Sequence, residues 1–187
     1  AVTGMDRKLG KLLDELKVLH LDQTTAVVLH GDHGWHLGEG GEWRKFTNFE
    51  LATRVPLIIY APWLHHRSNT DEEDDEEEAT AAAVATTTAP NSHRSAELVE
   101  LVDLYPTIAE LAGIPLPANE TFDGVSLVPL LHETRRVQQE WTPKAAAFSQ
   151  YPRRVKHTGE AWKGNSIIHH ERRTFTHMGY SARTASF

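Results

Sequence analysis

An aspartate and a histidine directly follow the first strongly apolar segment of this sequence. Residues 24–45 are TTAVVLHGDHGWHLGEGGEWRK, and Asp32 and His33 lie between Gly31 and Gly34. Glycine lets the backbone leave strand geometry, so that both side chains could turn toward one point. A carboxylate oxygen and an imidazole nitrogen together suit a divalent cation. Two ligands are too few for a catalytic metal site, so the sequence predicts that further ligands come from elsewhere.

A lysine follows in the same segment and predicts an anion site. Lys45 is a compact positive charge with three hydrogen-bond donors, which suits a sulfate or phosphate group held near a metal. A plainer interpretation stays open, because an Asp-His pair is commonly a turn in which the aspartate caps the backbone. On that interpretation Trp35 and Trp43 pack, Glu39 caps or bridges a loop, and His30 and His36 are structural or face solvent.

The elements around these residues indicate an α/β fold. Apolar residues at helical spacing predict a helix over 5–19, and the apolar segments 25–30 and 55–63 are typical of strands buried on both faces of a parallel sheet. In such sheets, ligands bind beyond the carboxyl ends of the strands, which is where Asp32 and His33 stand. A second helix is predicted over 96–114, kinked or split at Pro106 and ended by Gly113. Segments 145–151 and 178–184 are predicted strands.

Composition limits the function further. The 187 residues carry a net charge of -7, but eight of the 26 acidic residues form one run, 71–78. This run opens a low-complexity segment that we expect to be a disordered surface insertion. The basic residues form no stripe with interleaved aromatics, and no apolar run approaches a membrane span, which argues against nucleic-acid and membrane partners. The absence of cysteine excludes disulfides, thiolate metal sites and a cysteine nucleophile within these residues.

The segment LHGDHGWHLGEGGEWRKFTNFELATRVPLIIYAPW resembles the sulfatase family of the alkaline-phosphatase superfamily. ELVELVDLYPTIAELAGIPLP, FSQYPR and MGYSART agree with that resemblance. It implies an α/β fold that is part of an alkaline-phosphatase-like sandwich with a mostly parallel central sheet, followed by the start of a smaller C-terminal subdomain. On this basis residues 1–65 and 96–132 would belong to the catalytic domain, 66–95 to the insertion and 133–187 to the truncated subdomain.

The resemblance also implies residue roles. Asp32 and His33 would be two ligands of an active-site Ca2+, Lys45 would contact the sulfate and steady the leaving oxygen, and Trp35 would border the substrate pocket. Gln150-Tyr151-Pro152-Arg153 would lie near the active-site mouth. The similarity is greatest to members that remove the 2-sulfate from iduronate in heparan and dermatan sulfate, which implies a sulfated glycosaminoglycan substrate and a lysosomal or secreted location.

Two departures from the family pattern qualify these expectations. Gly40 stands where the family has His. The family's nucleophile is a formylglycine made from Cys in a C-x-P-S-R motif, which these residues lack together with its upstream pair of Asp ligands. We therefore expect a fragment that is inactive alone and is completed by an N-terminal part of the same protein. Two alternatives stay open: a metal-dependent phosphodiesterase or phosphomutase of the same superfamily, and a non-catalytic remnant.

Overall fold

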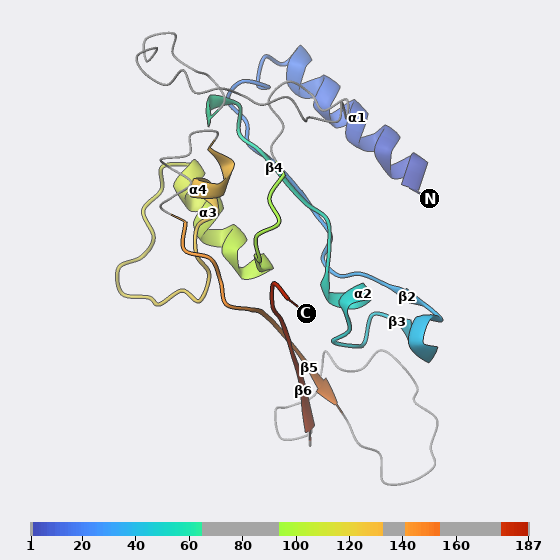
Figure 1. Cartoon of the computed structure of the whole chain (residues 1–187). Helices are drawn as coiled ribbons and strands as arrows, with labels where there is room; N and C mark the ends of the chain where they lie inside the picture. The colour runs from blue at the N-terminus through green and yellow to red at the C-terminus, as the bar shows by residue number, and fades with distance from the viewer. Residues whose placement is uncertain (1, 65–93, 133–140, 154–176, 187) are drawn as a thin grey trace, which may run out of the picture. The chain divides into compact units, whose positions relative to one another are not determined.

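The computed structural model describes residues 2–64, 94–132, 141–153 and 177–186 (Figure 1). The predicted insertion lies almost entirely outside them. Contacts divide the chain into two compact units. The first contains 1–28, 58–96 and 101–142, and the second contains 29–57, 97–100 and 143–187. The elements are mixed α and β, and each unit is described separately below.

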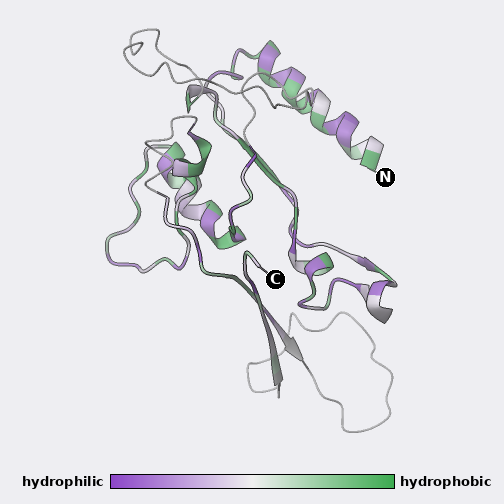
Figure 2. Ribbon diagram, in the orientation of Figure 1, coloured by the Kyte–Doolittle hydropathy of each residue, from purple (hydrophilic) through white to green (hydrophobic). Residues whose placement is uncertain are grey.

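The first helix, α1 (Val2–Val18), occupies nearly the predicted range and carries an apolar stripe. Leu9, Leu13 and Leu16 are half-buried and no residue of the helix is fully buried, while charged residues alternate with the apolar ones along it (Figure 2). Although α1 is the longest helix in the described segments, neither it nor any other helix there has the length and apolarity of a membrane-spanning segment.

The two predicted buried strands are present but shorter and less buried than expected. β1 (Val27–His30) pairs with β4 (Leu57–Tyr60), and a short 3-10 helix, η2 (Pro62–Leu64), follows. Beyond β1, the Gly31 N–H donates to the carbonyl oxygen of Pro56 and the Gly34 N–H to that of Ala52, so the two chain segments run in opposite directions. Residues of β4 alternate between half-buried and exposed. The predicted mostly parallel central sheet is thus not observed in the described residues, where each strand has one paired neighbour.

The glycine-rich segment between these strands forms a small hairpin. β2 (His36–Leu37) pairs antiparallel with β3 (Trp43–Arg44), and a single 3-10 turn, η1 (Glu39–Gly41), connects them. Gly38, Gly40 and Gly41 all have positive φ, which glycine adopts without steric cost and which closes the turn. A one-turn helix, α2 (Glu50–Thr53), then leads to β4.

The second predicted helix is shorter than expected. A 3-10 helix, η3 (Leu101–Asp103), leads into α3 (Leu104–Leu111), and residues 94–100 have no regular structure, so the prediction over 96–114 was too long. Pro106 lies in the first turn of α3, where its missing N–H is tolerated. Gly113 has φ +66° and its N–H donates to the carbonyl oxygen of Glu110, which confirms the predicted helix end.

Two buried polar side chains hold the following loop against α3. The Oδ1 of Asp103 accepts the N–H of Val125 at 2.9 Å, and the Oγ1 of Thr107 accepts the N–H of Leu127 at 2.8 Å. Thr107 also donates its hydroxyl to the carbonyl oxygen of Asp103, and both side chains are fully buried. The loop thereby reaches α4 (Val128–Leu131), whose Val128 joins Leu104 and Leu127 in the small apolar core.

The last two predicted strands form an antiparallel hairpin. β5 (Ala147–Arg153) pairs with β6 (His177–Arg183) from Ala147↔Arg183 to Arg153↔His177. Glu100 anchors its first strand, because its carboxylate accepts from the Lys144 ammonium at 2.6 Å and from the Phe148 N–H at 2.8 Å. The connection between the strands lies outside the described residues.

We predict that Thr107→Val weakens the loop at 124–128. Valine keeps the volume but leaves the buried N–H of Leu127 without an acceptor, which costs about 1–3 kcal/mol. Amide hydrogen exchange should show a matching loss of protection at Leu127, whereas Thr107→Ser, which keeps the hydroxyl, should leave it near wild type. Equal protection in the valine variant would show that this hydrogen bond does not hold the loop.

Candidate anion and metal site

The structure brings Asp32, His33 and Lys45 together in the second unit. The Nε2 of His33 lies 3.2 Å from the Oδ2 of Asp32 and 2.7 Å from the Nζ of Lys45, a residue twelve positions later. The Asp32 side chain is 80% exposed, whereas that of His33 is 29% exposed. The acid and the ammonium therefore converge on one imidazole nitrogen.

The hydrogen bonds of His33 determine which ring nitrogen is available. Its Nδ1 lies 2.9 Å from the carbonyl oxygen of Gly34, an acceptor, so this nitrogen carries the proton and donates it. The lone pair of a neutral ring is then on Nε2, where it accepts from the Lys45 ammonium. The backbone N–H of His33 donates to Asp32 Oδ1 at 3.0 Å, which fixes the carboxylate beside the ring.

Gly34 sets the position of the His33 backbone. A Cβ at residue 34 would lie 1.9 Å from the carbonyl oxygen of Leu51, and the Gly34 N–H donates to the carbonyl oxygen of Ala52 at 2.9 Å. Only glycine allows this close approach of the two backbones. The turn after β1 is consequently held against α2, and the carbonyl that orients the imidazole is held with it.

The β2–β3 hairpin returns the chain so that Lys45 faces His33. Glu39 Oε2 accepts the N–H of Leu37 at 2.6 Å within the hairpin. This hydrogen bond, with a second from the Glu39 backbone, lowers the pKa of the Glu39 carboxyl. The ionised Glu39 carboxylate, which accepts this hydrogen bond, is therefore favoured at neutral pH. Its contribution is lost as the pH falls through the lowered pKa. Glu39 thus bridges the loop, one of the two roles expected for it.

The remaining predicted residues lie around this cluster. Trp35 is 50% exposed, with its ring centroid 6.3 Å from that of His33. Gly40, at the position where the resemblance implies a His, has φ +64° and open space at its missing Cβ. Tyr151 stacks obliquely on Phe46, the neighbour of Lys45, at 6.0 Å between ring centroids. Tyr151, in the predicted 150–153 segment, therefore contacts the residue that follows Lys45.

One buried contact close to Lys45 in the sequence was not foreseen. His36 is 2% exposed and its Nε2 lies 3.0 Å from the Thr47 Oγ1, two residues beyond Lys45. From the sequence, His36 was predicted to be either structural or solvent-facing, and in the structure it is buried. A histidine in a glycine-rich segment shows no periodicity that would reveal its partner, so only the tertiary structure identifies Thr47.

The donor set of Asp32 and His33 fits part of a metal site. The Asp32 Oδ2 and the His33 Nε2 face each other, and both atoms are of types that bind a divalent cation, although in this structure the Nε2 lone pair accepts from Lys45. Ca2+ takes six to eight ligands, mostly oxygens, and no group of three or more acidic or histidine side chains in the described parts of the chain could hold a metal. The two residues can therefore supply two ligands of a larger set.

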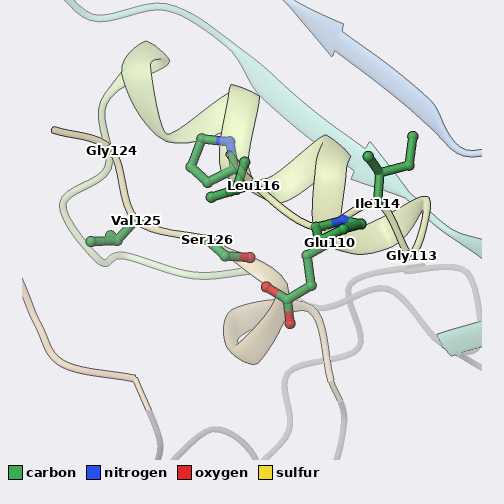
Figure 3. Close-up of a pocket in the computed structure, with 9 residues that line it drawn as sticks. Glu110, Gly113, Ile114, Leu116, Gly124, Val125 and Ser126 are labelled. Atoms are coloured by element: carbon green, nitrogen blue, oxygen red, sulfur yellow. The ribbon is translucent and has the colours of Figure 1, made fainter. Parts of the chain in front are cut away.

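A separate cavity of about 640 Å3 lies in the first unit, between α3 and the loop after it (Figure 3). Its lining is mainly apolar, with Pro106, Ile114, Leu116 and Val125, and Glu110 is the charged residue among the lining side chains. A carboxylate in an apolar cavity does not suit a sulfate or phosphate anion. The cavity contains none of the predicted site residues.

A comparison with known protein families identifies the family to which this chain belongs. A family model described as Sulfatase matches residues 1–114, which is more than half of the chain. The chain therefore belongs to the sulfatase family, as the sequence motifs indicated.

Individual relatives agree with this membership. The chain is 31% identical over its whole length to iduronate 2-sulfatase of Mus musculus and 32% identical over 82% of its length to that of Homo sapiens. It is also 32% identical over 81% of its length to a choline-sulfatase of Rhizobium meliloti. The chain spans about a third of the length of the two iduronate 2-sulfatases, 35% and 30% respectively.

Solved structures support the fold. A phosphonate monoester hydrolase of Agrobacterium radiobacter matches 82% of this chain and 25% of its own, with a TM-score of 0.57 and 23% identity. A protein solved with its substrate D-glucosamine-2-N,6-O-disulfate matches 98% of this chain and 28% of its own, with a TM-score of 0.56 and 22% identity. The mixed α/β arrangement is thus shared with hydrolases of phosphonate esters and with a protein that binds a sulfated sugar.

We predict that Gly34→Ala disrupts the site. The added methyl group would overlap the Leu51 carbonyl, and overpacking of this kind costs about 3 kcal/mol or more. The Lys45–His33 contact should be lost, which nuclear magnetic resonance of the His33 ring nitrogens would detect. Gly10→Ala in α1, where a Cβ meets nothing within 4 Å, is the matched control and should leave the spectrum unchanged. Unchanged His33 signals in Gly34→Ala would refute the role given to Gly34.

Proposed function

We propose that this chain is part of a sulfuric ester hydrolase that acts on sulfated glycosaminoglycans, with iduronate 2-sulfate of heparan or dermatan sulfate as the substrate. The convergence of Asp32, His33 and Lys45 carries the proposal. The fold brings the Lys45 ammonium, which would bind the anionic ester, to His33, although the two residues are twelve positions apart. Sulfatase membership and the two iduronate 2-sulfatases support the choice of reaction and sugar. A lysosomal or secreted location belongs to the same proposal.

Each residue has a role in this proposal. Lys45 donates hydrogen bonds to a sulfate oxygen and steadies the negative charge that develops on the leaving oxygen. Asp32 would hold Ca2+ together with His33 once the Lys45 ammonium moves from the His33 Nε2 to the sulfate, because that nitrogen has one lone pair. Bound Ca2+ would supply Lewis-acid stabilisation of the sulfate. Trp35, half exposed beside His33, borders the sugar. β1 and β4 would belong to a larger, mostly parallel sheet of an alkaline-phosphatase-like sandwich in the whole protein.

A second candidate is hydrolysis of a phosphonate or phosphate ester. Two phosphonate monoester hydrolases share the fold, one of them, from Silicibacter pomeroyi, at 27% identity and a TM-score of 0.55. A lysine beside two metal ligands would suit either tetrahedral anion, so the preference for sulfate rests on the family match. Competition between inorganic sulfate and methylphosphonate for the chain would distinguish the two candidates.

We predict that inorganic sulfate binds to the 187-residue chain through Lys45. Lys45→Ala should weaken sulfate binding about tenfold, equivalent to about 1.4 kcal/mol, as measured by isothermal titration calorimetry. Lys17→Ala, which removes one of the exposed lysines of α1, is the control and should bind as wild type does. Hydrolysis of an aryl sulfate should be absent, because these residues include no cysteine from which formylglycine could be made. Undiminished sulfate binding by Lys45→Ala would contradict the role proposed for Lys45, and turnover by the chain would contradict its predicted inactivity.

We predict that Ca2+ binds weakly and requires Asp32. With two ligands the dissociation constant should be about millimolar, the weak end for protein Ca2+ sites. Addition of Ca2+ should shift the amide signals of His33 and Gly34 in the wild type but not in Asp32→Asn. Asp14→Asn in α1 removes an exposed carboxylate elsewhere and should respond as the wild type does. Equal shifts with and without the Asp32 carboxylate would exclude it as a ligand.

A further inference from the structure

His36 is the most buried polar side chain of the second unit's loop, and its burial needs a reason. It is 2% exposed, its Nε2 lies 3.0 Å from Thr47 Oγ1, and its ring meets Phe49 edge-on at 6.3 Å. Its Nδ1 is buried without a hydrogen-bond partner. Burying a polar ring in this way is unfavourable unless its hydrogen bond compensates. An apolar side chain would fill the same space at less cost, so the bond to Thr47 is the distinguishing contribution of His36.

The two attachments of His36 lie on either side of Lys45. In the hairpin, His36 is the cross-strand partner of Arg44, the residue before Lys45. Through its side chain it binds Thr47, which follows Lys45 by two positions and is itself 5% exposed. The Thr47 hydroxyl also accepts the N–H of Phe49 at 3.3 Å. The backbone that carries Lys45 is thus fixed before and after the lysine by contacts to one residue.

The backbone at this point is also in a conformation that needs support. Arg44 has φ +72°, in the left-handed region that L-residues with a side chain rarely occupy. Such a residue persists where its surroundings over-determine it, at a cost of about 1–3 kcal/mol. The change of direction at Arg44 lies directly before Lys45, and the His36 contacts are on both sides of it.

We propose that His36, acting through Thr47, is a positioning residue that holds the Lys45 ammonium at the Nε2 of His33. Lysine has a flexible four-carbon stem, and its ammonium remains in one place only if the backbone below it is fixed. The assignment rests on the proposed function in one respect, since Lys45 is taken there as the group that contacts the anion. His36 itself touches neither Asp32 nor His33 through any hydrogen bond found in the described residues.

The experiment measures how fast Lys45 reacts in the full 187-residue chain. Each variant is treated briefly with a small acetylating reagent, and the modification of Lys45 and Lys17 is followed by mass spectrometry. Lys45 is half-buried and bound to His33, so it should react slowly, whereas Lys17 in α1 has a 69% exposed side chain and serves as the internal control. Thr47→Val removes only the hydroxyl, Thr47→Ser keeps it, and His36→Leu removes the imidazole while filling its space.

Thr47→Val and His36→Leu should each raise the Lys45 rate about threefold or more, because the freed side chain regains rotamers away from His33. Lys17 should not change, and Thr47→Ser should restore the slow rate. Two results would overturn the proposal: an unchanged Lys45 rate in both disrupting variants, or a parallel rise at Lys45 and Lys17, since the pair would then support the fold rather than the lysine.

A sulfate arm separates this inference from the proposed function. In the wild type, saturating inorganic sulfate should slow the acetylation of Lys45 further and leave Lys17 unaffected. If sulfate protects Lys45 but neither Thr47→Val nor His36→Leu changes its rate, the positioning role of His36 fails while the anion site stands. If Thr47→Val raises the acetylation rate of Lys45 but sulfate does not lower it in the wild type, the positioning role of His36 is supported. The proposed sulfate site is then contradicted.

Discussion

The orientation of the His33 imidazole is the constraint on which the rest of the site depends. One ring nitrogen donates to the carbonyl oxygen of Gly34, and this leaves the other to face Lys45 and Asp32. Gly34 is in turn fixed by its N–H bond to Ala52 and by the Leu51 carbonyl, which occupies the space of a side chain. The chemistry of the cluster is therefore decided by a backbone contact between a turn and the short helix α2.

The loop that carries Lys45 is supported by parts of the chain that come much later. Phe46 contacts Tyr151 of β5, and the side chain of Asn48 lies 3.1 Å from the Cβ position of Gly179 in β6. β5 is itself anchored by Glu100 through its bonds to Lys144 and the backbone of Phe148. The C-terminal hairpin thus has a structural link to the segment that carries Lys45, and its place at the mouth of the active site stays a prediction.

The fold alone does not distinguish which ester the proposed hydrolase would cleave. Phosphonate monoester hydrolases and a protein that binds a disulfated glucosamine have the same arrangement, and one fold commonly supports several chemistries. The described site contains one lysine, one imidazole and one carboxylate. In the proposed function the lysine would bind a tetrahedral anion by its oxygens, which sulfate and phosphonate share. Membership of the sulfatase family makes sulfate the better choice.

The amino-acid sequence determined the features that rest on local patterns. Helical spacing located α1, positive φ at a glycine ended α3 at Gly113, and the β5 and β6 segments formed strands where expected. The sequence also indicated Asp32, His33 and Lys45 as a group, because a polar cluster among glycines after an apolar strand is a recognisable pattern. It overestimated the second helix: residues 94–100 have no regular structure, and the Glu100 side chain binds Lys144 and the backbone of Phe148, contacts that no local pattern predicts.

Tertiary structure decided the features that depend on contacts between distant residues. The mutual distances in the cluster, the close approach of Gly34 to Leu51 and the partner of the buried His36 all follow from how the turn, the hairpin and α2 pack. A hydrogen bond such as that from His36 to Thr47 has no periodicity and no fixed spacing, so no sequence pattern identifies it. It exists because the hairpin brings the two side chains together where water is excluded and each must find a polar partner.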